Sequence, residues 1–400
     1  MKKLLLLGGS RYLLPVIEAA HKLGYYTITC DYLPDNVAHK HSDEYRNVSI
    51  VDKDAVLQVA QEIKIDGIMS FACDPGVVTA AYVAEKMGLP SSGSYKAVSI
   101  LQNKGRFRRF LSENGFNVPM AKAYTSVQDA LKDTNLFHWP VIVKPTDSAG
   151  SKGVTRVNVP EKLADSIMSA LSFSRCNEFI IENFIELKGF SSDTDCFSVN
   201  GELKFVSFSS QRFDKKAANP YVPAAYSWPA SISEINQKEL TSEIQRLLKL
   251  LEMRTSIYNI ETREGADGKA YIMEVSPRGG GNRLAEMLWY ATGVDLITNS
   301  VRAAVGERIE SIEQKPYDGY WAEIILHSDK QGVFASLWVS EDIKENVIQT
   351  DLWVKQGDKV ESFSAANEAI GTLVLRFDTQ HELEKVLTDT EQYVKVLLEN

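Results

Sequence analysis

Short apolar runs alternate with amphipathic helical patterns along the first hundred residues. Each apolar run has the length of a buried strand, and the segments between the runs repeat apolar residues at helical spacing. This alternation implies parallel strands joined by right-handed crossovers. The expected strands are Lys3–Leu7, Tyr25–Asp31 and Gly67–Phe71, and the expected helices are Leu13–Leu23, Asp54–Ile63 and Gly76–Met87.

Glycine-rich or acidic turns follow these strands, and parallel sheets bind their ligands at the carboxyl ends of the strands. Gly8–Ser10 follows the first strand, Asp31 ends the second, and Asp74–Gly76 follows the third. A dinucleotide site would need G-x-G-x-x-G, which the glycine turn does not supply. We favour a substrate-binding turn, and a turn without a ligand is the alternative. The candidate substrate residues at this edge are Gly9, Ser10 and Asp74.

The composition excludes several classes of protein. The chain has 400 residues, of which 44% are hydrophobic and 24% charged, enough for two or three packed domains. It is therefore neither disordered, fibrous nor a small disulfide scaffold. The 44 Lys and Arg residues against 53 Asp and Glu give a net charge of −9, which argues against a nucleic acid as the partner.

Cysteine usage and hydropathy indicate a cytoplasmic location. The four cysteines are scattered without a C-x-x-C pair, which is typical of reduced thiols. The apolar start, Leu4–Leu7, is shorter than the core of about 7–15 residues that a signal peptide needs. No run approaches the ~18 apolar residues of a membrane span, so no membrane partner is expected.

The sequence pattern changes after Pro90–Gly93, a segment typical of a linker. The expected units are an N-terminal α/β unit of residues 1–97, a central unit of residues 98–305 and a C-terminal β-rich unit of residues 306–400. The later elements expected are a basic helix over Val98–Asn114, strands between Val141 and Val206, a long helix over Ile232–Leu251 and a final helix over Thr379–Leu398.

A β-hairpin is expected around Asp267-Gly268, a pair that tolerates the positive φ of a tight turn. If this pair forms the turn, Glu261 faces Glu274 and Asn259 faces Ser276. Directly paired side chains share one sheet face, with Cβ atoms about 4.5–5.5 Å apart. Two facing carboxylates repel, but a bound cation reverses the effect, and Mg²⁺ prefers one or two carboxylates together with phosphate oxygens. Two solvated glutamates on an exposed face are the alternative.

Two glycine-rich segments are candidates for contact with an anion. Pro277–Arg283 combines three glycines, which allow close backbone approach, with Arg278 and Arg283, which supply charge for phosphate or carboxylate. Thr146–Val154 contains small residues and two glycines, which suit a mobile loop whose amides bind phosphates. The second segment lacks the P-loop pattern, so a surface hairpin is its alternative.

Lysines and a linker surround the second of these segments. Lys144 ends a buried-looking strand, where its amine must reach solvent or an anion. Lys104 opens the basic helix, for which a solvated charged face is the alternative. Downstream, the strand Phe179–Glu182 runs into a linker whose free backbone groups suit the edge of an adenine.

In this order, the features resemble the ATP-grasp superfamily over nearly the full length of the chain. No element is specific by itself, whereas five in order are. The matching elements are Asn103-Lys104, Val141–Pro145 with its glycine loop, Glu182–Ile185, Glu261 and Glu274–Arg278. The resemblance is to the purine-biosynthetic and biotin-carboxylase-like branch. It implies an α/β and α+β ATP-grasp fold with an N-terminal Rossmann-like parallel sheet domain, a two-part ATP-binding domain with its adenine linker near residues 182–186, and a C-terminal β-rich subdomain.

The resemblance also implies a role for each matching residue. ATP contacts are implied for Lys104, Lys144, Ser148, Gly150, Ser151, Gly153, Glu182, Phe184, Ile185 and Glu186. Metal ligation, to Mg²⁺ or to Mn²⁺ in its place, is implied for Glu261, Glu274 and Ser276. Catalytic roles are implied for Arg278 and Lys144, and the substrate cleft would be lined by Gly9, Ser10, Asp74, Arg278 and Arg283.

Two positions depart from the family pattern. Gly189 stands where a ribose-binding glutamate is usual, and Glu186, its substitute, lies one turn of chain too early. Ser276 stands where the family usually has an asparagine as a metal ligand, and a hydroxyl is a shorter and weaker oxygen ligand.

The implied activity is that of an ADP-forming carbon–nitrogen ligase. It would phosphorylate a small-molecule carboxylate to an acyl phosphate and couple it to an amine, releasing ADP and phosphate. One alternative is a bicarbonate-using, carboxylase-like enzyme that acts on a purine-type precursor. The other is a nucleotide-binding homologue without catalysis, which Gly189 and Ser276 favour but the retained Lys144, Glu261 and Arg278 oppose. The expected partners are ATP, the carboxylate and the amine, and the branch implies a homodimer.

Overall fold

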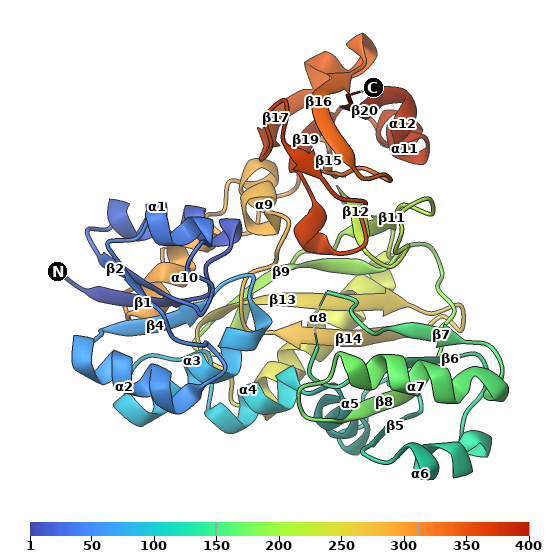
Figure 1. The fold of residues 1–400 in the computed structure, drawn as a ribbon, viewed down its shortest axis with the longest axis horizontal. Helices are drawn as coiled ribbons and strands as arrows, with labels where there is room; N and C mark the ends of the chain where they lie inside the picture. The colour runs from blue at the N-terminus through green and yellow to red at the C-terminus, as the bar shows by residue number, and fades with distance from the viewer. Residues whose placement is uncertain (149, 311, 400) are drawn as a thin grey trace.

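The computed structural model describes residues 1–148, 150–310 and 312–399. The described strands form five sheets. Figure 1 shows an α/β unit next to the N-terminus, antiparallel sheets through the middle of the molecule, and the C-terminal strands rising from them. The combination of a parallel N-terminal sheet with antiparallel sheets elsewhere confirms the predicted fold class.

The first sheet is parallel, with strand order β3-β2-β1-β4. Its central strand β1 is entirely apolar after Lys3, and Leu4–Leu7 are fully buried. A strand covered on both faces reads as a continuous apolar run, as found here. The bounds are β1 Lys3–Leu7, β2 Tyr26–Cys30, β3 Glu44–Arg46, β4 Gly67–Ser70, α1 Leu14–Lys22, α2 Lys53–Ile63 and α3 Asp74–Met87.

One face of this sheet is covered from far along the chain. Leu5 and Leu7 pack with α2 and α3, whereas Leu4 and Leu6 share a core with α1 and α10 (Leu296–Ala304). Gly67 makes the approach of α10 possible, because a Cβ there would lie 2.3 Å from the carbonyl oxygen of Ala304. Residues 296–304 therefore help to bury the N-terminal sheet (Figure 1).

The expected basic helix is wrong as one continuous helix, because Asn103 divides it. Helix α4 (Tyr95–Gln102) ends and α5 (Lys104–Glu113) begins at this residue. Asn103 has extended backbone angles, and its side-chain oxygen accepts a 2.8 Å hydrogen bond from the Arg106 amide, so it is the N-cap of α5. Lys104 consequently starts a helix, and its amide donates to the carbonyl of Thr146 at 3.0 Å.

Two antiparallel sheets form the centre of the molecule (Figure 1). The first has the order β5-β8-β6-β7, and helices α6 and α7 share its core. The second has the order β10-β9-β13-β14, and one of its faces packs on α4, α5 and α8, which confirms the long helix expected near residue 240. The bounds are β5 Ala121–Tyr124, α6 Val127–Lys132, β6 Val141–Pro145, β7 Thr155–Val157, α7 Leu163–Ser172, β8 Phe179–Asn183, β9 Ser192–Val199, β10 Glu202–Phe205, α8 Glu234–Leu250, β13 Ser256–Glu264 and β14 Ala270–Ser276.

The C-terminal strands form a five-stranded sheet and a three-stranded sheet. The five-stranded sheet has the order β11-β12-β15-β19-β17, so it recruits β11 and β12 from the middle of the chain. The three-stranded sheet has the order β18-β16-β20. The bounds are β11 Ser210–Phe213, β12 Pro223–Trp228, α9 Leu284–Thr292, β15 Tyr320–Leu326, β16 Gly332–Val339, β17 Val347–Leu352, β18 Lys359–Val360 and β19 Gly371–Phe377.

The single helix expected over Thr379–Leu398 is wrong, because the helical segment is interrupted at Asp389 and ends at Tyr393. Helices α11 (Gln380–Thr388) and α12 (Thr390–Tyr393) are followed by strand β20 (Val394–Leu398), which pairs with β16. Alternate residues of β20 pack on the C-terminal core, and this period of two fits a half-buried strand rather than a helix. Neighbouring strands thus override the helical interpretation of this segment.

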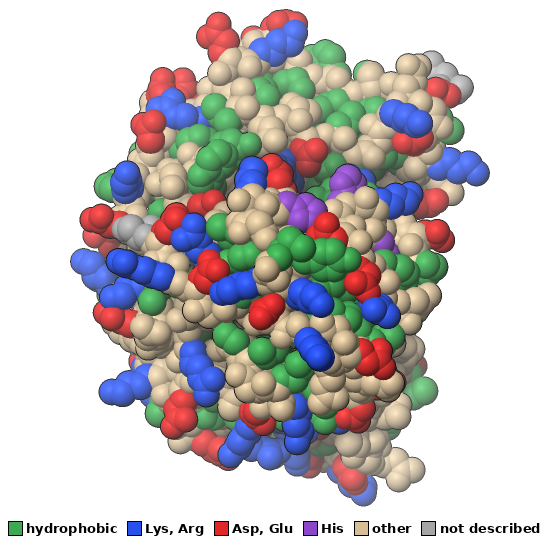
Figure 2. Space-filling model, turned by 90° about the vertical axis from the view of Figure 1, so that its left-hand side faces the viewer, with side chains coloured by type: hydrophobic (Ala, Val, Ile, Leu, Met, Phe, Trp, Pro, Cys, Tyr) green, Lys and Arg blue, Asp and Glu red, His purple; other side chains and the backbone are tan. Residues whose placement is uncertain are grey.

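Surface and cysteine features agree with the composition. All four cysteines are free thiols. Among the described residues, no helix combines the length and hydrophobicity that crossing a membrane requires. On the face in Figure 2, Lys and Arg side chains are interspersed with Asp and Glu side chains.

Candidate functional site

Two rows of polar side chains cross one face of the sheet β10-β9-β13-β14. Register pairs Glu274 with Glu261 and Glu261 with Asp193, so these three residues form one row across β14, β13 and β9. The neighbouring row consists of Ser276, Asn259 and Asp195. Alternate residues of the same strands, such as Tyr258 and Ile260, belong to the apolar core on the opposite face. The sheet therefore presents six oxygen-bearing side chains on one surface.

The pairing of Glu261 with Glu274 confirms the prediction, but the turn that was expected to produce it is wrong. Glu264 pairs with Ala270, so the loop is longer than the expected Asp267-Gly268 turn, and the pairing near it is offset by one residue. A β-bulge at Met273 adds one residue to β14 and restores the register that places the glutamates opposite each other.

Each of the two glutamates is paired with a cation. Lys104 Nζ lies 3.1 Å from Glu274 Oε1, and Arg263 Nη2 lies 2.9 Å from Glu261 Oε1. Burial opposes the ionisation of Glu274, but the ammonium groups of Lys104 and Lys144 hold the pKa of that carboxyl below its ordinary value. The repulsion expected between facing carboxylates is therefore offset within the protein.

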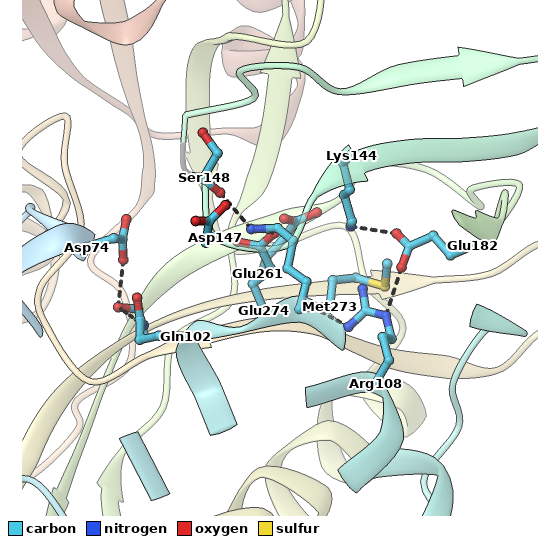
Figure 3. A network of polar contacts seen from close by, with 12 residues as sticks. Asp74, Gln102, Arg108, Lys144, Asp147, Ser148, Glu182, Glu261, Met273 and Glu274 are labelled. Atoms are coloured by element: carbon cyan, nitrogen blue, oxygen red, sulfur yellow. Dashed lines mark hydrogen bonds and ion pairs between the residues drawn. The ribbon is translucent and has the colours of Figure 1, made fainter. Parts of the chain in front are cut away.

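A buried chain of ion pairs links β6 and β8 to the bulge of β14 (Figure 3). Glu182 lies 2.5 Å from the amine of Lys144 and accepts a 3.0 Å hydrogen bond from Arg108 Nε. Arg108 also donates a 2.7 Å bond to the carbonyl of Met273. Burial raises the pKa of Glu182, but Arg108 and Lys144 outweigh it and lower the pKa to about 2, so the carboxyl is ionised.

Burial lowers the pKa of Lys144, an effect that Glu182 opposes and Arg108 increases. The expected anion partner of Lys144 is thus found on the neighbouring strand β8. An incoming phosphate would add a second anion beside this amine, which burial leaves poorly solvated.

Lys104 connects the glutamate row to the glycine loop, which is the segment Thr146–Val154. Its Nζ donates a 2.9 Å hydrogen bond to the carbonyl of Ser148, and Figure 3 shows Ser148 and Asp147 above Glu261 and Glu274. Ser151, which has a φ of 59°, donates through its hydroxyl to the carbonyl of Tyr221 at 3.1 Å. Gly150 and Gly153 have φ angles of 67° and 70°. Ala149 lies outside the described residues.

The expected adenine linker has some free backbone groups. The amide of Phe184 is already bonded to the carbonyl of Pro140 at 3.1 Å, and its ring lies 4.2 Å from the Arg156 guanidinium. Ile185 is the second residue after β8, and among the described residues its main-chain groups have no protein partner. Glu186 is exposed and lies 3.4 Å from Arg156. Gly189 has a φ of 76°, where a glutamate would be strained.

Arg278 and Asp74, two of the residues expected to line the substrate cleft, form an ion pair. The guanidinium binds the carboxylate through two bonds, Nε to Oδ1 at 3.0 Å and Nη2 to Oδ2 at 2.8 Å. Burial opposes the ionisation of Asp74, but Arg278 holds its pKa below the ordinary value. Ser276 donates to Asp74 at 2.8 Å and accepts from Gln102 at 2.8 Å, so its hydroxyl is bonded to the residue that holds Arg278.

Other expected cleft residues have different neighbours. Arg283 pairs with Glu286 at 2.8 Å and with Asp351 at 3.2 Å, which ties it to the C-terminal sheet. Gly9 packs against the segment that follows β2, because a Cβ at Gly9 would lie 2.6 Å from the side chain of His39. The buried hydroxyl of Ser10 has no hydrogen-bond partner among the described residues.

Sequence reasoning missed three groups of the site. Arg108 is buried at the centre of the ion-pair chain, although it belongs to a run interpreted as a basic helix face. Its position beside Phe107 and three residues before Leu111, both buried, was the available signal. Asp193 and Asp195 were also missed, and their alternation along a strand was the signal that they share one face.

Comparison with known proteins matches the central part of the chain to a domain family. The sequence profile of the ATP-grasp domain matches residues 137–286, which contain Lys144, the glycine loop, Glu182, both row glutamates and Arg278. Residues 137–286 therefore form an ATP-grasp domain.

Individual ATP-grasp proteins resemble this chain at low sequence identity. The carbamoyl phosphate synthase large chain of Pseudothermotoga lettingae is 23% identical over 338 residues, which are 83% of this chain and 30% of that relative. The structure of an L-amino acid ligase from Bacillus licheniformis has a TM-score of 0.81 at 20% identity, covering 100% of this chain and 99% of the other. Phosphoribosylglycinamide synthetase from Anaerococcus prevotii has a TM-score of 0.78 at 20% identity, covering all of both chains. These two structures show that the fold of the whole chain resembles theirs.

The oxygen donors on the sheet face fit a magnesium ion that arrives with a nucleotide. Within the described part of the chain, no three His, Cys, Asp or Glu side chains are grouped so as to hold a metal ion by themselves. Glu261 and Glu274, facing each other, supply the one or two carboxylates that Mg²⁺ usually takes from a protein, with phosphate oxygens and water completing its shell.

Proposed function

We propose that the chain is an ADP-forming ligase that phosphorylates a small-molecule carboxylate and couples the acyl phosphate to an amine. The observation that carries this proposal is the facing pair of Glu274 and Glu261. Lys104 binds Glu274, and the strand that carries Glu274 leads into Arg278. Paired carboxylates, a lysine and an arginine at one edge are the groups that phosphoryl transfer to a carboxylate requires.

The nucleotide would lie between the two central sheets. Lys104 and Lys144 would contact its phosphates, and the glycine loop would cover them and exclude water, which hydrolyses an acyl phosphate. Ile185 would offer its free main-chain groups to the adenine edge. The residues proposed to contact ATP are Lys104, Lys144, Ser148, Gly150, Ser151, Gly153, Glu182, Phe184, Ile185 and Glu186.

The metal ligands proposed are Glu261 and Glu274, with Ser276 next to them. Bound Mg²⁺ would neutralise the oxygens of the phosphoryl group in transfer. The hydroxyl of Ser276 is already bonded to both Asp74 and Gln102. We therefore propose that Asn259 assists Ser276 as a metal ligand. Asn259 lies directly across from Ser276, and its amide nitrogen, not its oxygen, bonds to Asp193 and Asp195.

The reaction would proceed in two balanced steps. A carboxylate oxygen of the substrate attacks the γ-phosphorus of ATP, and the bond to the β-γ bridging oxygen breaks to release ADP. The amine nitrogen then attacks the acyl carbon, phosphate leaves, and the nitrogen loses a proton. Arg278 would stabilise the charge in both steps, and Asp74 fixes its guanidinium with two hydrogen bonds. Ser10 and Asp74 would lie nearest the substrate, with Gly9 and Arg283 supporting the walls.

The division into units remains a proposal. We retain an N-terminal unit of residues 1–97, a central unit of residues 98–305 and a C-terminal unit of residues 306–400. To these we add that α10 packs on the first unit and that β12 pairs with the third. A homodimer remains the proposed assembly.

Incubation of the full chain with Mg-ATP and substrate pools tests this function. Amino acids, small acids, amines and bicarbonate are supplied in separate and combined pools, and ADP and phosphate are measured. ADP that depends on a carboxylate with an amine, and that disappears in Lys144→Ala and Glu274→Gln, supports the ligase. Release of AMP and pyrophosphate would contradict an acyl phosphate.

The same assay separates the alternatives. Turnover that depends on bicarbonate supports the carboxylase-like enzyme. Tight binding of ATP without ADP from any pool supports a homologue without catalysis. The matched control is Glu202→Gln, because Glu202 lies on β10 of the same sheet and is exposed.

A further inference from the structure

Glu323 is a fully buried carboxyl group in the C-terminal sheet. It lies in the middle of the apolar strand β15, and its exposed fraction is 0%. Among the described residues, neither of its two oxygens has a hydrogen-bond partner. Asp195 is also fully buried, and its Oδ2 likewise has no partner there. Charged groups are rarely left in this state, because burying an unpaired charge is costly.

Glu323 faces the polar rows of the central sheet. Register pairs it with Tyr226 on β12, so the two side chains share one face of the five-stranded sheet. The hydroxyl of Tyr226 accepts from Asn282 at 3.3 Å and lies 3.5 Å from Asp193 Oδ2. Asn282 in turn accepts from the hydroxyl of Tyr12 at 3.1 Å. These bonds place Glu323 where the C-terminal sheet meets β9 and the glycine-rich segment Pro277–Arg283.

Asp195 approaches the same place from the central sheet. Its Oδ1 accepts hydrogen bonds from the amide of Gly280 at 2.8 Å and from Asn259 at 3.3 Å. Its Oδ2 has no partner among the described residues. Gly280 is required for this approach, because a Cβ there would lie 2.9 Å from Asp195 Oδ1. Burial raises the pKa of Glu323 well above its ordinary value, and the nearby Asp195 adds to the shift.

The cations that lie nearest are already bound to other acids. The guanidinium of Arg283 pairs with Glu286 and Asp351, and that of Arg278 holds Asp74 through two bonds. Arg278 lowers the pKa of Asp195, and Arg283 lowers the pKa of Glu323, in each case through its charge and without a hydrogen bond. Glu323 and Asp195 therefore present three free oxygens for which the protein supplies no cation within the described residues.

We propose that Glu323 and Asp195, together with the hydroxyl group of Tyr226, bind the ammonium group of an amine-bearing substrate. The inference rests on the proposed ligase function and names the class of one of its substrates. An ammonium group offers a positive charge, which favours ionisation of the two carboxyl groups, and three N–H donors, which match their three free oxygens.

The position agrees with this chemistry. Asp195 belongs to the row next to that of Glu261, and Arg278 lies close enough to shift the pKa of Asp195. An ammonium bound here would hold the substrate beside the proposed acyl phosphate. A metal ion is a poorer occupant, because no group of three suitable ligands exists in the described chain.

Kinetics with paired substrate pools test the inference. The full chain with Mg-ATP receives the twenty L-amino acids, or the same acids with N-acetylated amines, and ADP is measured. We expect turnover with the free amines, and about tenfold or more loss on acetylation. Glu323→Gln and Asp195→Asn should raise the KM for the amino acid pool about tenfold and leave the KM for ATP nearly unchanged. The control is Asp318→Asn, an exposed acid that precedes the same strand.

Two outcomes of this assay overturn the inference. One is equal turnover of the acetylated pool, and the other is an unchanged KM for the amino acids in Glu323→Gln. If no pool yields ADP, the proposed function fails, and a binding measurement then decides the inference separately.

Thermal unfolding in glycinamide supplies that measurement, with acetamide as the uncharged control at equal ionic strength. Glycinamide should raise the melting temperature of the wild type by about 2 °C or more, as a ligand of the folded state does. Glu323→Gln should show no rise while retaining its response to Mg-ATP, which shows that it folds. No rise in the wild type, or the same rise in Glu323→Gln, overturns the inference.

Discussion

The guanidinium of Arg108 donates a 2.7 Å hydrogen bond to the main-chain carbonyl of Met273, the bulged residue of β14. A bulged residue stands outside the regular ladder, so its carbonyl is available to a side chain. Arg108 also binds Glu182, which binds Lys144. One arginine thus connects the proposed adenine side of the site with the strand that carries Glu274.

Replacement of Arg108 by methionine should lower both stability and nucleotide affinity. The change leaves Glu182 with one cation instead of two and leaves the carbonyl of Met273 without its donor. Breaking a buried ion pair in this way costs about 3–5 kcal/mol. We expect a fall of about 3 kcal/mol in the free energy of urea unfolding, and a weaker binding of ATP in calorimetry.

The neighbouring Arg109 provides the matched control for this change. Arg109 is exposed on the same helix, so Arg109→Met should alter stability by no more than about 0.5 kcal/mol. Similar losses in both variants would mean that the buried network contributes nothing specific.

In the glycine-rich segment Pro277–Arg283, alanine should be destabilising at Gly280 and tolerated at Gly281. A Cβ at Gly280 would lie 2.6 Å from Leu284 Cδ1 and 2.9 Å from Asp195 Oδ1, whereas at Gly281 the nearest atom, in Tyr12, is 3.8 Å away. Gly280→Ala should therefore lower the free energy of unfolding by about 1–3 kcal/mol, and Gly281→Ala by less than about 0.5 kcal/mol. Urea unfolding of the two variants checks the difference, and equal effects would contradict this packing.

These glycines also show what the sequence could and could not predict. Three glycines suggested close backbone approach, and the approach is real, but Gly279 meets Phe71 and Gly280 meets Asp195. The partner of a close approach depends on strand order and on the placement of distant segments, which a local pattern does not contain.

The paired glutamates illustrate the same limit. Period-two alternation was enough to predict that Glu261 lies opposite Glu274. The loop shifts the pairing by one residue from the expected register, and the bulge at Met273 shifts it back. The bulge carbonyl is held by Arg108, which lies 165 positions earlier in the chain. Asp193 and Glu323 belong to the site through strand neighbours, β9 beside β13 and β15 beside β12, and these pairings are not visible in the local sequence.

The two row glutamates should bind a divalent ion weakly until ATP is present. Glu274 is paired with Lys104 and Glu261 with Arg263, so a free ion must displace these cations, whereas ATP phosphates supply the cations with new partners. We expect Mn²⁺ binding, measured by electron paramagnetic resonance, to strengthen about tenfold or more when ATP is added. Glu274→Gln should remove this gain and Glu202→Gln should keep it; tight binding of Mn²⁺ without ATP would contradict the prediction.

The contribution of Asp195 to folding stability should fall as pH rises from about 4 to 7. Burial raises the pKa of this carboxyl from 3.8 to about 7, against the opposing effect of Arg278. Between these values the folded chain holds a proton that the unfolded chain has released, so the free energy of unfolding decreases with pH and levels off above about 7. Relative to the wild type, Asp195→Asn should gain about 2–4 kcal/mol across this window, measured by urea unfolding at several pH values. Asp318→Asn, exposed at 87%, should run parallel to the wild type, and a parallel curve for Asp195→Asn would show that Asp195 is ionised in the free protein.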